Sequence, residues 1–335
     1  MPIINQQVLI KSMPVGLLQL SNFELIKKPL LTSLPEGKFL VRALWLSLDP
    51  YVRSLLSGRH FLNMPQKGDL WPAAAVAEVI ESQHAVFKSG ELVVLPMGLQ
   101  AYTISDGTGV WKLSKQHVPP STALGILGMP GMTAYFGLNE IAHLKSNETV
   151  VVSAASGPVG SMVGQITRLR GARVIGIAGS EEKCNWAREN AKFFACINYK
   201  TENVDERLRS LAPNGVDVFF DNSGGELQNL IIGGRHLALK GRVVLCGLID
   251  QYSKQQAPPG PNLGPLMACR GRIEPIIVYD YEDRREEFLS EALAWYAAGE
   301  LVYKEDIRVG LEYAGEHFCR LMRGENFGKS LIQLC

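Results

Sequence analysis

The pattern of hydrophobic and polar positions changes once along the chain, near residue 125. Before that point, short runs rich in Val, Leu and aromatic residues alternate with clusters of Gly, Pro and Ser, and helical spacing is scarce. Such runs are typical of strands joined by turns. We therefore expect a small all-β unit with strands over residues 39–51, 73–82 and 90–104.

After Thr149 the pattern becomes an alternation of strands and helices. The runs 149–155 and 172–179 are continuously apolar, and the segments 160–171 and 180–191 that follow them have helical spacing. Continuous apolar strands between helices are typical of a parallel sheet that is covered on both faces. We therefore predict an α/β fold with a doubly wound parallel sheet. The alternation continues through 195–200, 204–211, 215–225 and 241–249.

Two further helices are expected in the last part of the sequence. The segment 311–324 should end at Gly324, because Gly commonly follows the last helical residue. The segment 283–301 places five apolar residues at helical spacing, which predicts a face packed into the core. These residues are Phe288, Leu289, Ala292, Leu293 and Tyr296.

Length and charge narrow the class of protein. A chain of 335 residues is expected to form about two domains. Its 34 Lys and Arg against 33 Asp and Glu give a net charge of +1, which argues against nucleic acid or an anionic membrane as the main partner. Residues 116–139 contain no charged side chain and are long enough to span a bilayer, but three prolines and four glycines interrupt them. We interpret them as a buried segment at a domain junction and expect no membrane contact.

The cysteines indicate a reducing environment. No two of the six lie within ten residues of each other, so neither a C-x-x-C redox pair nor a zinc knuckle is present. The first residues, MPIINQQVLIKS, are mixed and polar and do not resemble a secretory signal. We therefore expect free thiols and a cytoplasmic location. The cysteines are Cys184, Cys196, Cys246, Cys269, Cys319 and Cys335.

The most informative motif lies between the first predicted strand and helix of the alternating part. Ala155-x-Gly157-x-x-Gly160 matches the dinucleotide-binding fingerprint, with Ala in the first glycine position. Small residues here allow a tight turn, a close approach to a pyrophosphate and close packing of helix on strand. The bare amides of the helix N-terminus then face the phosphate charge. The motif predicts a nucleotide-binding sheet.

The end of the second strand indicates which nucleotide. An NAD-binding sheet usually has an acidic residue there, whereas this chain has Gly179 and Ser180, with Lys183 one helical turn further on. A hydroxyl and a cation favour a ribose 2′-phosphate, so we favour NADP(H). Glu181 and Glu182 lie close by, and they and Ser180 also fit an ordinary helix N-terminus with Ser180 as its cap; the two interpretations can hold at once.

Nine motifs in a fixed order support a resemblance to a known family. They are SLDPYVR (47–53), GMPGMTAYFGL (128–138), AASGPVGSMVGQ (154–165), GIAGSEEK (176–183), NYK (198–200), FFDNSGG (219–225), CGLIDQY (246–252), RIEPIIVYDY (272–281) and GENFGKSL (324–331). The chain resembles the zinc-independent medium-chain dehydrogenase/reductase superfamily. Within it, the chain is most similar to the prostaglandin/leukotriene reductase branch, which includes NADPH-dependent curcumin and alkenal reductases. The resemblance covers nearly the whole chain.

The resemblance implies a discontinuous domain plan. A GroES-like β-barrel domain, which carries substrate and catalytic residues, would consist of residues 1–125 plus 305–335. A Rossmann domain with a doubly wound parallel sheet, which binds NADP, would be inserted as residues 126–304.

The resemblance also implies an activity. Members of the branch transfer hydride from NADPH to the β-carbon of α,β-unsaturated ketones or aldehydes, which reduces the carbon–carbon double bond of enones and enals. The partner would be a small electrophilic molecule, and a homodimer is expected. The alternatives are an NADPH quinone reductase and a catalytically silent NADPH-binding protein.

No metal ion is expected, although zinc alcohol dehydrogenases share this architecture. A catalytic zinc site needs three ligands and an open position, and the early segment KGDLWPAAAVAEV supplies neither His nor Cys. The histidines fall in no ligand spacing; they are His60, His84, His117, His143, His236 and His317.

The resemblance assigns candidate site residues one by one. For catalysis it points to Tyr252 and Tyr51, phenols that are protonated at neutral pH and so can donate a hydrogen bond or a proton. Tyr51 can equally pack its loop. The candidate cofactor residues are Gly157, Pro158, Val159, Gly160, Ser180, Lys183, Tyr199, Asn222, Cys246, Gly247, Ile249, Tyr252, Ile276, Ile277, Val278 and Asn326.

The chain departs from the family pattern around the expected substrate site. The segment 57–70 contains no tyrosine, so His60 is its candidate donor. Residues 73–79 are rich in alanine where relatives have glycine, and Pro275 stands where glycine is usual. These departures motivate the silent-protein alternative.

Overall fold

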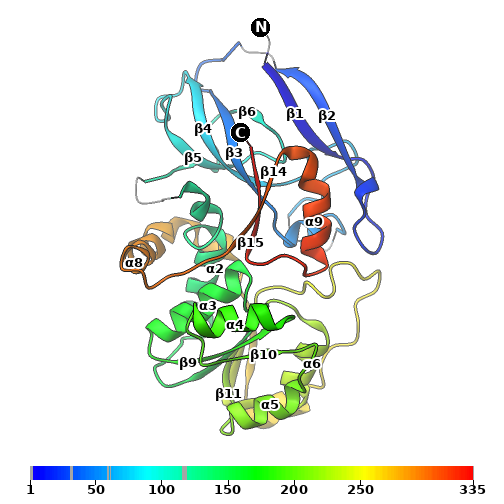
Figure 1. Cartoon of the computed structure of the whole chain (residues 1–335), viewed down its shortest axis with the longest axis vertical. Helices are drawn as coiled ribbons and strands as arrows, with labels where there is room; N and C mark the ends of the chain where they lie inside the picture. Colours follow the sequence, from blue (N-terminus) through cyan, green and yellow to red (C-terminus); the bar gives the residue numbers. More distant parts are fainter. Residues whose placement is uncertain (1–2, 31–32, 59, 61, 115–118, 335) are drawn as a thin grey trace. The chain divides into compact units, whose positions relative to one another are not determined.

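The computed structural model describes residues 3–30, 33–58, 60, 62–114 and 119–334. It divides into two compact units (Figure 1). Unit 1 consists of residues 1–124 and 305–335, and unit 2 of residues 125–304. His117 and residues 116–118 of the uncharged segment lie outside the described residues.

Unit 1 is built mainly from antiparallel strands. In its seven-stranded sheet, β3 (Phe39–Ser47) pairs antiparallel with both β4 (Ala74–Ser82) and β15 (Lys329–Gln333). The pairing of β15 with β3 brings the last part of the chain into the sheet formed by the first part (Figure 1). The other strands of this sheet are β5 (Leu92–Pro96), β6 (Tyr102–Ser105), β7 (Trp111–Lys112) and β14 (Glu305–Val309).

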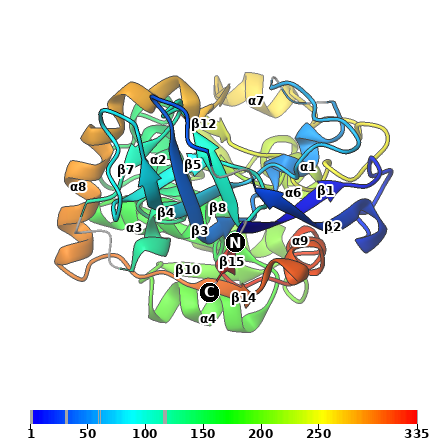
Figure 2. The same cartoon turned by 90° about the horizontal axis from the view of Figure 1, so that it is seen from above.

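A hairpin and a helix close the core of unit 1. β1 (Ile3–Ile10) and β2 (Phe23–Leu30) pair antiparallel, and α9 (Ala314–Met322) lies beside them (Figure 2). Fully buried Trp71 stacks on Phe23, with ring centroids 4.0 Å apart, and also contacts Phe318 of α9. The shorter helices of this unit are η1 (Leu20–Asn22), α1 (Tyr51–Leu55), η2 (Pro120–Leu124) and η5 (Leu311–Tyr313).

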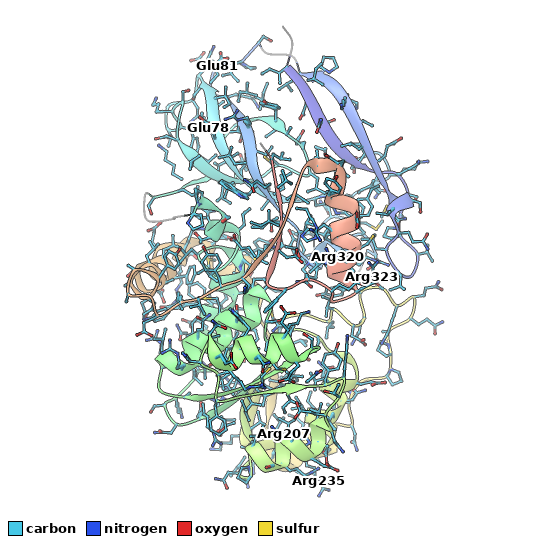
Figure 3. The ribbon with its side chains drawn as sticks, in the orientation of Figure 1. Glu78, Glu81, Arg207, Arg235, Arg320 and Arg323 are labelled. Carbon is cyan, nitrogen blue, oxygen red and sulfur yellow. The ribbon has the colours of Figure 1, made fainter. Side chains whose placement is uncertain are left out.

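Charged side chains fix the chain just after α9. Arg320 lies in the last turn of α9, and Arg323 follows its last residue directly (Figure 3). Both pair with Glu325, at N–O distances of 3.7 and 2.6 Å. These ion pairs hold the segment that precedes Asn326, while Gly324, with φ +70°, follows the helix as predicted.

Unit 2 contains a six-stranded sheet in which every pairing is parallel. The strand order is β10-β9-β8-β11-β12-β13, so the order of connection reverses between β8 and β11. This confirms the predicted doubly wound α/β fold. The strands are β8 (Thr149–Ser153), β9 (Arg173–Ala178), β10 (Ala195–Asn198), β11 (Val216–Asp221), β12 (Leu237–Leu245) and β13 (Arg272–Pro275).

Helices pack on both faces of this sheet. On one face, Leu208 and Ile231 share a buried cluster with Phe219 of β11. The neighbouring residue Phe220 points to the opposite face, where it touches Gly137 so closely that a Cβ there would lie 2.5 Å away. The helices of unit 2 are α2 (Met129–Phe136), η3 (Gly137–Ile141), α3 (Pro158–Leu169), α4 (Glu181–Glu189), α5 (Val204–Leu211), α6 (Gly225–Gly233), α7 (Gly264–Cys269), η4 (Val278–Arg284) and α8 (Arg285–Ala297).

Several predicted elements differ from the observed ones in unit 1. The predicted strand 39–51 ends at Ser47, because Pro50 lacks an N–H for the ladder and, with φ −58°, leads into helix α1. That helix lies inside the unit we expected to be all-β. The predicted strand 90–104 is two strands, separated at Gly98, which has φ +70°.

In unit 2 the differences are smaller. The strand predicted over 149–155 ends at Ser153, because Ala154 takes a left-handed conformation with φ +52°. Phe288, Leu289 and Ala292 form the buried face predicted for α8. Leu293 and Tyr296 are only half-buried.

In the described part of the chain, no helix combines the length and the apolar character that crossing a membrane requires.

Candidate functional site

The candidate cofactor residues of unit 2 lie at one edge of its sheet. Because all six strands run in the same direction, their carboxyl ends share this edge, which is where ligands bind in open α/β sheets. Each candidate residue follows one of these ends. Gly157, Pro158, Val159 and Gly160 follow β8; Ser180 and Lys183 follow β9; Tyr199 follows β10; Asn222 follows β11; Cys246, Gly247, Ile249 and Tyr252 follow β12; Ile276, Ile277 and Val278 follow β13.

The turn after β8 brings helix α3 very close to the strand. A Cβ added to Gly160 would lie 2.3 Å from the carbonyl oxygen of Ala154, so only glycine fits. Ala154 itself has φ +52°, an unfavourable conformation for a residue with a side chain. The turn is therefore held in a geometry that its own sequence does not favour.

The first turn of α3 has no side-chain cap. Its N-cap residue is Gly157, and Pro158 follows at the first helical position, where the missing N–H costs nothing. The amides of Val159 and Gly160 have no acceptor within the helix, as at any helix start. A bound anion would satisfy them and would also interact favourably with the helix dipole.

The start of α4 is organised differently. The Ser180 hydroxyl accepts a hydrogen bond from the Lys183 backbone N–H at 3.3 Å, so the cap interpretation of Ser180 is confirmed. The ring of Tyr199 lies against Gly179, where a Cβ would be 3.1 Å from the phenol. Glu181 is paired with Arg188, at 2.7 Å between Oε1 and Nη2. Ser180 and Lys183 therefore share the start of α4, and Tyr199 lies against the neighbouring Gly179.

Buried Asp221 organises the reversal point of the strand order. Its carboxylate accepts hydrogen bonds from the Ser153 hydroxyl at 3.2 Å, from the backbone N–H groups of Ser223 and Gly224, and from Gln228. Burial nevertheless raises the pKa of Asp221, and the hydrogen bonds only partly offset it.

Asn222 connects the two central strands at the same point. Its side-chain amide donates to the Ser153 carbonyl oxygen at 2.8 Å, and its backbone N–H donates to the Ser153 hydroxyl at 2.8 Å. The ends of β8 and β11 are therefore fixed relative to each other.

The segment after β12 begins on the same carboxyl edge. The backbone N–H groups of Cys246 and Gly247 donate to the Asp221 carbonyl oxygen, at 2.9 and 3.0 Å. Burial, together with the nearby Asp221, raises the pKa of Cys246 to about 12, so its thiol is protonated at neutral pH.

Tyr252 is folded back onto this segment. Its hydroxyl oxygen accepts a hydrogen bond from the Leu248 N–H at 3.2 Å. Burial raises the pKa of the Tyr252 phenol, so the group stays protonated at neutral pH. Within the described residues the hydroxyl only accepts, which leaves its proton for another partner.

The last candidate segment of unit 2 continues the sheet edge. The Ile276 N–H donates to the Leu245 carbonyl oxygen at 3.1 Å. Ile276 and Val278 are buried, and Ile277 is half-buried.

In unit 1 a buried ion pair joins the segments that carry the other two candidates. Lys329 Nζ contacts Asp49 Oδ1 at 2.6 Å and donates to the Leu48 carbonyl oxygen at 2.9 Å. Asp49 lies two residues before Tyr51, and Lys329 three residues after Asn326. Asn326 also folds its own turn, because its amide donates to the Gly328 carbonyl oxygen at 2.9 Å.

Tyr51 and His60 lie next to each other. Their ring centroids are 5.6 Å apart, and Tyr51 also packs against the core of unit 1. His60 Nδ1 accepts from the Leu62 N–H at 3.1 Å. Burial lowers the pKa of His60, which favours the neutral ring.

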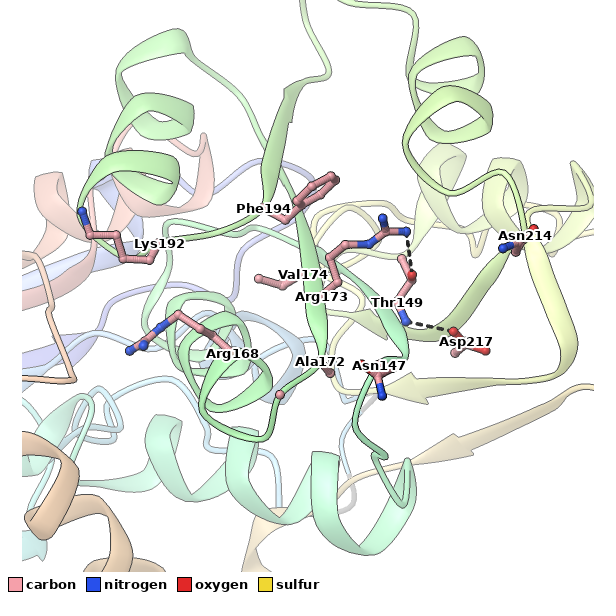
Figure 4. A pocket seen from close by; sticks show the side chains of 12 residues that line it. Asn147, Thr149, Arg168, Ala172, Arg173, Val174, Lys192, Phe194, Asn214 and Asp217 are labelled. Carbon is pink, nitrogen blue, oxygen red and sulfur yellow. Dashed lines mark hydrogen bonds between the residues drawn. The ribbon is translucent and has the colours of Figure 1, made fainter.

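A polar pocket of about 530 Å³ lies at the amino ends of the strands, away from the candidate residues. Figure 4 shows Arg168 and Lys192 pointing to one side and Arg173 to the other, so the cations do not converge. Arg168 is already paired with Glu300 at 2.9 Å. The lining residues are Asn147, Thr149, Arg168, Gly171, Ala172, Arg173, Val174, Lys192, Phe194, Asn214, Gly215 and Asp217.

Among the residues that the structure describes, no three His, Cys, Asp or Glu side chains gather in a group that could hold a metal ion. The absence of a metal ion remains a prediction.

Two family models match the chain in succession. "N-terminal domain of oxidoreductase" matches residues 6–113, and "Zinc-binding dehydrogenase" matches residues 158–297. The fold and these matches define a dehydrogenase-type oxidoreductase.

Similar proteins narrow the class further. The chain is 38% identical to the NADPH-dependent curcumin reductase of Escherichia coli, over 98% of this chain and 97% of that protein. It is 40% identical to prostaglandin reductase 1 of Rattus norvegicus, over 93% and 94%. The crystal structure of CurA from Vibrio vulnificus in complex with NADPH superposes with a TM-score of 0.93 at 39% identity, over 98% of this chain and 99% of that one. The chain belongs to the medium-chain dehydrogenase/reductase superfamily, in the branch of the prostaglandin, curcumin and alkenal reductases.

Sequence reasoning missed the residues that hold the site in place. Asp221 had a usable signal, since it is a carboxylate at the end of the apolar run VFF. Asp49 and Lys329 are separated by 280 residues, and no local pattern connects them.

Proposed function

We propose that this protein is an NADPH-dependent reductase of the carbon–carbon double bond in α,β-unsaturated ketones and aldehydes. The observation that carries the proposal is the uncapped, glycine-built start of α3 at the strand-order reversal, in a chain that belongs to this branch of reductases.

The residues at the sheet edge fit the cofactor. Gly157 and Gly160 leave room for a pyrophosphate, and the amides of Val159 and Gly160 would bind it. No carboxylate ends β9, and Glu181 is engaged by Arg188. Ser180, Lys183 and Tyr199 would therefore hold the 2′-phosphate that distinguishes NADPH from NADH.

The remaining candidates would line the rest of the cofactor. Asn222, Ile249 and the segments 246–247 and 276–278 follow neighbouring strand ends, where backbone and apolar groups shape an extended binding edge. Asn326 of unit 1 is assigned to the nicotinamide end.

The chemistry divides between cofactor and protein. NADPH, when bound, supplies a hydride for the substrate's β-carbon. Tyr252 would donate a hydrogen bond to the substrate's carbonyl oxygen, where negative charge develops, and this stabilises the transition state more than the ground state. Its raised pKa keeps the proton on the phenol for that purpose. Tyr51 is the second candidate donor, and the Asp49–Lys329 pair would position its helix.

The test is an NADPH-oxidation assay of the purified protein against enones, enals and quinones. We expect turnover of enones and enals, with NADPH preferred over NADH. Turnover of quinones alone would support the quinone reductase alternative instead. Tight NADPH binding without oxidation by any acceptor would identify a silent binding protein.

Tyr252→Phe tests the catalytic assignment. Loss of one donor to the developing oxyanion should lower kcat about 100-fold, with the Kd for NADPH little changed. Tyr51→Phe is the matched variant for the second phenol. Wild-type turnover in Tyr252→Phe would remove this residue from the mechanism.

Residues 126–304 would bind NADPH, and residues 1–125 with 305–335 would supply the substrate side. A homodimer is supported by the edge strand β13 and by exposed Leu263 and Met267 on or next to α7; sedimentation measures its mass. The cytoplasmic location rests on the cysteines and is tested by cell fractionation.

A further inference from the structure

Two cysteines from different elements meet beneath the start of α4. Cys184 lies in the first half of α4 and Cys196 is the second residue of β10. Their sulfur atoms are 3.1 Å apart, and the two residues are 0% and 2% exposed. A disulfide bond is about 2.05 Å long, so the sulfurs need to approach by about 1 Å to form one.

The contact shifts the pKa values of the two thiols in opposite directions. The S–H of Cys196 donates to Cys184 Sγ, which lowers the pKa of Cys184. The same hydrogen bond, together with burial, raises the pKa of Cys196. Arg188 lies nearby and donates to the Cys196 carbonyl oxygen at 3.3 Å. Cys184 is therefore the thiol that ionises first and acts as the nucleophile.

Access of an oxidant to the buried pair requires a local opening of α4. α4 is a nine-residue helix on the surface of unit 2, with Glu181 and Glu182 exposed. Local opening of such a surface helix costs less free energy than global unfolding. Hydrogen peroxide is close to water in size, so a brief opening admits it.

We propose that Cys184 and Cys196 are an oxidative modification site, which peroxide converts into a disulfide that fastens α4 to β10. In the first step the Cys184 thiolate attacks one peroxide oxygen, the O–O bond breaks, and a sulfenic acid and one water form. In the second step the Cys196 sulfur attacks the Cys184 sulfur, which releases the second water. Two thiols thus lose two electrons and two protons, and one peroxide becomes two waters. A dithiol reductant reverses the change by thiol–disulfide exchange.

The site also has a consequence for the cofactor, and this part rests on the proposed function. Lys183 precedes Cys184 directly, and Tyr199 follows Cys196 by three residues. An approach of about 1 Å between α4 and β10 would shift both groups proposed to hold the 2′-phosphate. We expect the Kd for NADPH to rise several-fold in the oxidised protein.

Mass spectrometry tests the modification directly. The full-length protein is reduced, exposed to hydrogen peroxide, and alkylated with N-ethylmaleimide in denaturant. We expect two thiols to escape alkylation and unreduced digests to contain one cross-linked peptide joining residues 184 and 196. Dithiothreitol should restore both thiols. Full alkylation after peroxide treatment, or a cross-link between other cysteines, would overturn the proposal.

Two variants provide the controls. Cys196→Ala should abolish the cross-link and leave Cys184 to oxidise to acids that dithiothreitol does not fully reverse. Cys269→Ser, on α7, should form the cross-link as the wild type does. If Cys196→Ala fails to fold, Cys184→Ser serves in its place, and the wild-type peptide map decides on its own.

The cofactor effect is read separately by titration of NADPH into the reduced and the cross-linked protein. An unchanged Kd in the cross-linked protein would overturn the coupling to the cofactor. A protein that binds no NADPH in either state would refute the proposed function, while the peptide map would still decide the disulfide.

Discussion

Helices α3 and α4 start at the same sheet edge, one strand apart, yet they begin in opposite ways. The N-cap residue of α3 is Gly157, which has no side chain to cap the helix, and the third residue of α3, Gly160, packs directly on the Ala154 carbonyl. The N-cap residue of α4 is Ser180, whose hydroxyl caps the Lys183 amide. No side chain accepts a hydrogen bond from the first amides of α3, whereas the Ser180 hydroxyl accepts one from the Lys183 amide of α4.

The difference shows that the two helix starts offer different groups to a ligand: backbone amides at α3 and side chains at α4. An uncapped helix start leaves its amides for a ligand, at a cost in stability that the rest of the sheet offsets. A capped start is stable by itself and presents side chains instead. We therefore expect substitutions at the start of α3 to change the affinity for NADPH and NADH alike. Substitutions at the start of α4 should change the affinity for NADPH more than that for NADH.

The largest effect on stability should come from adding a side chain at Gly160, where α3 packs against the end of β8. In Gly160→Ala the new Cβ would lie 2.3 Å from a backbone oxygen, so helix and strand must separate, which should lower the free energy of unfolding by about 3 kcal/mol. In Gly233→Ala on α6 the nearest atom is 3.6 Å away. That control should be neutral or slightly stabilising. Urea unfolding measures both, and equal effects would contradict the close packing.

A cap on α3 would make it resemble α4. Gly157→Asp places a carboxylate at the N-cap, which satisfies a free amide but repels a pyrophosphate. We expect roughly a hundredfold loss of affinity for both NADPH and NADH. Gly157→Asn adds a similar side chain without the charge and should lose much less. Similar affinities in the two variants, measured by fluorescence titration, would mean that no phosphate binds there.

Removal of the cation from α4 should discriminate between cofactors. Lys183→Ala should weaken NADPH at least tenfold, because a charged hydrogen bond contributes about 1.5–3 kcal/mol, and should leave NADH nearly unchanged. Lys192→Ala is the matched control, because it removes an exposed lysine just beyond the other end of α4. An equal loss for the two cofactors in Lys183→Ala would refute the assignment of the 2′-phosphate.

The smallest effect should come from removing the α4 cap. Ser180→Ala should lower the free energy of unfolding by about 1 kcal/mol and weaken NADPH a few-fold. Asn203 caps α5 in the same way, by accepting from the Glu206 amide at 3.3 Å. Asn203→Ala should cost similar stability in thermal unfolding without any change in NADPH affinity. A matching loss of affinity in both variants would show that Ser180 acts only through stability.

The fold was largely predictable from the sequence because its signals are local. Apolar runs and helical spacing identify β8, α3, β9 and α4 to within a few residues, and Gly157 and Gly160 mark the turn between the first two. The ends of strands were predicted wrongly where the φ angle of a single residue ends the strand, as at Pro50, Gly98 and Ala154. Such angles end or begin an element without changing the hydrophobic pattern around them.

The sequence by itself determined the alternation of strands and helices, the glycine turn and the residues that follow each strand. Only the tertiary structure decided what holds them together: the parallel order that gathers six strand ends at one edge, the Asp221 network, the Asp49–Lys329 pair and the Cys184–Cys196 contact. The physical reason is distance along the chain. Spacing within a segment reports which residues share a face, whereas contacts between segments depend on strand order and register, which no local pattern encodes.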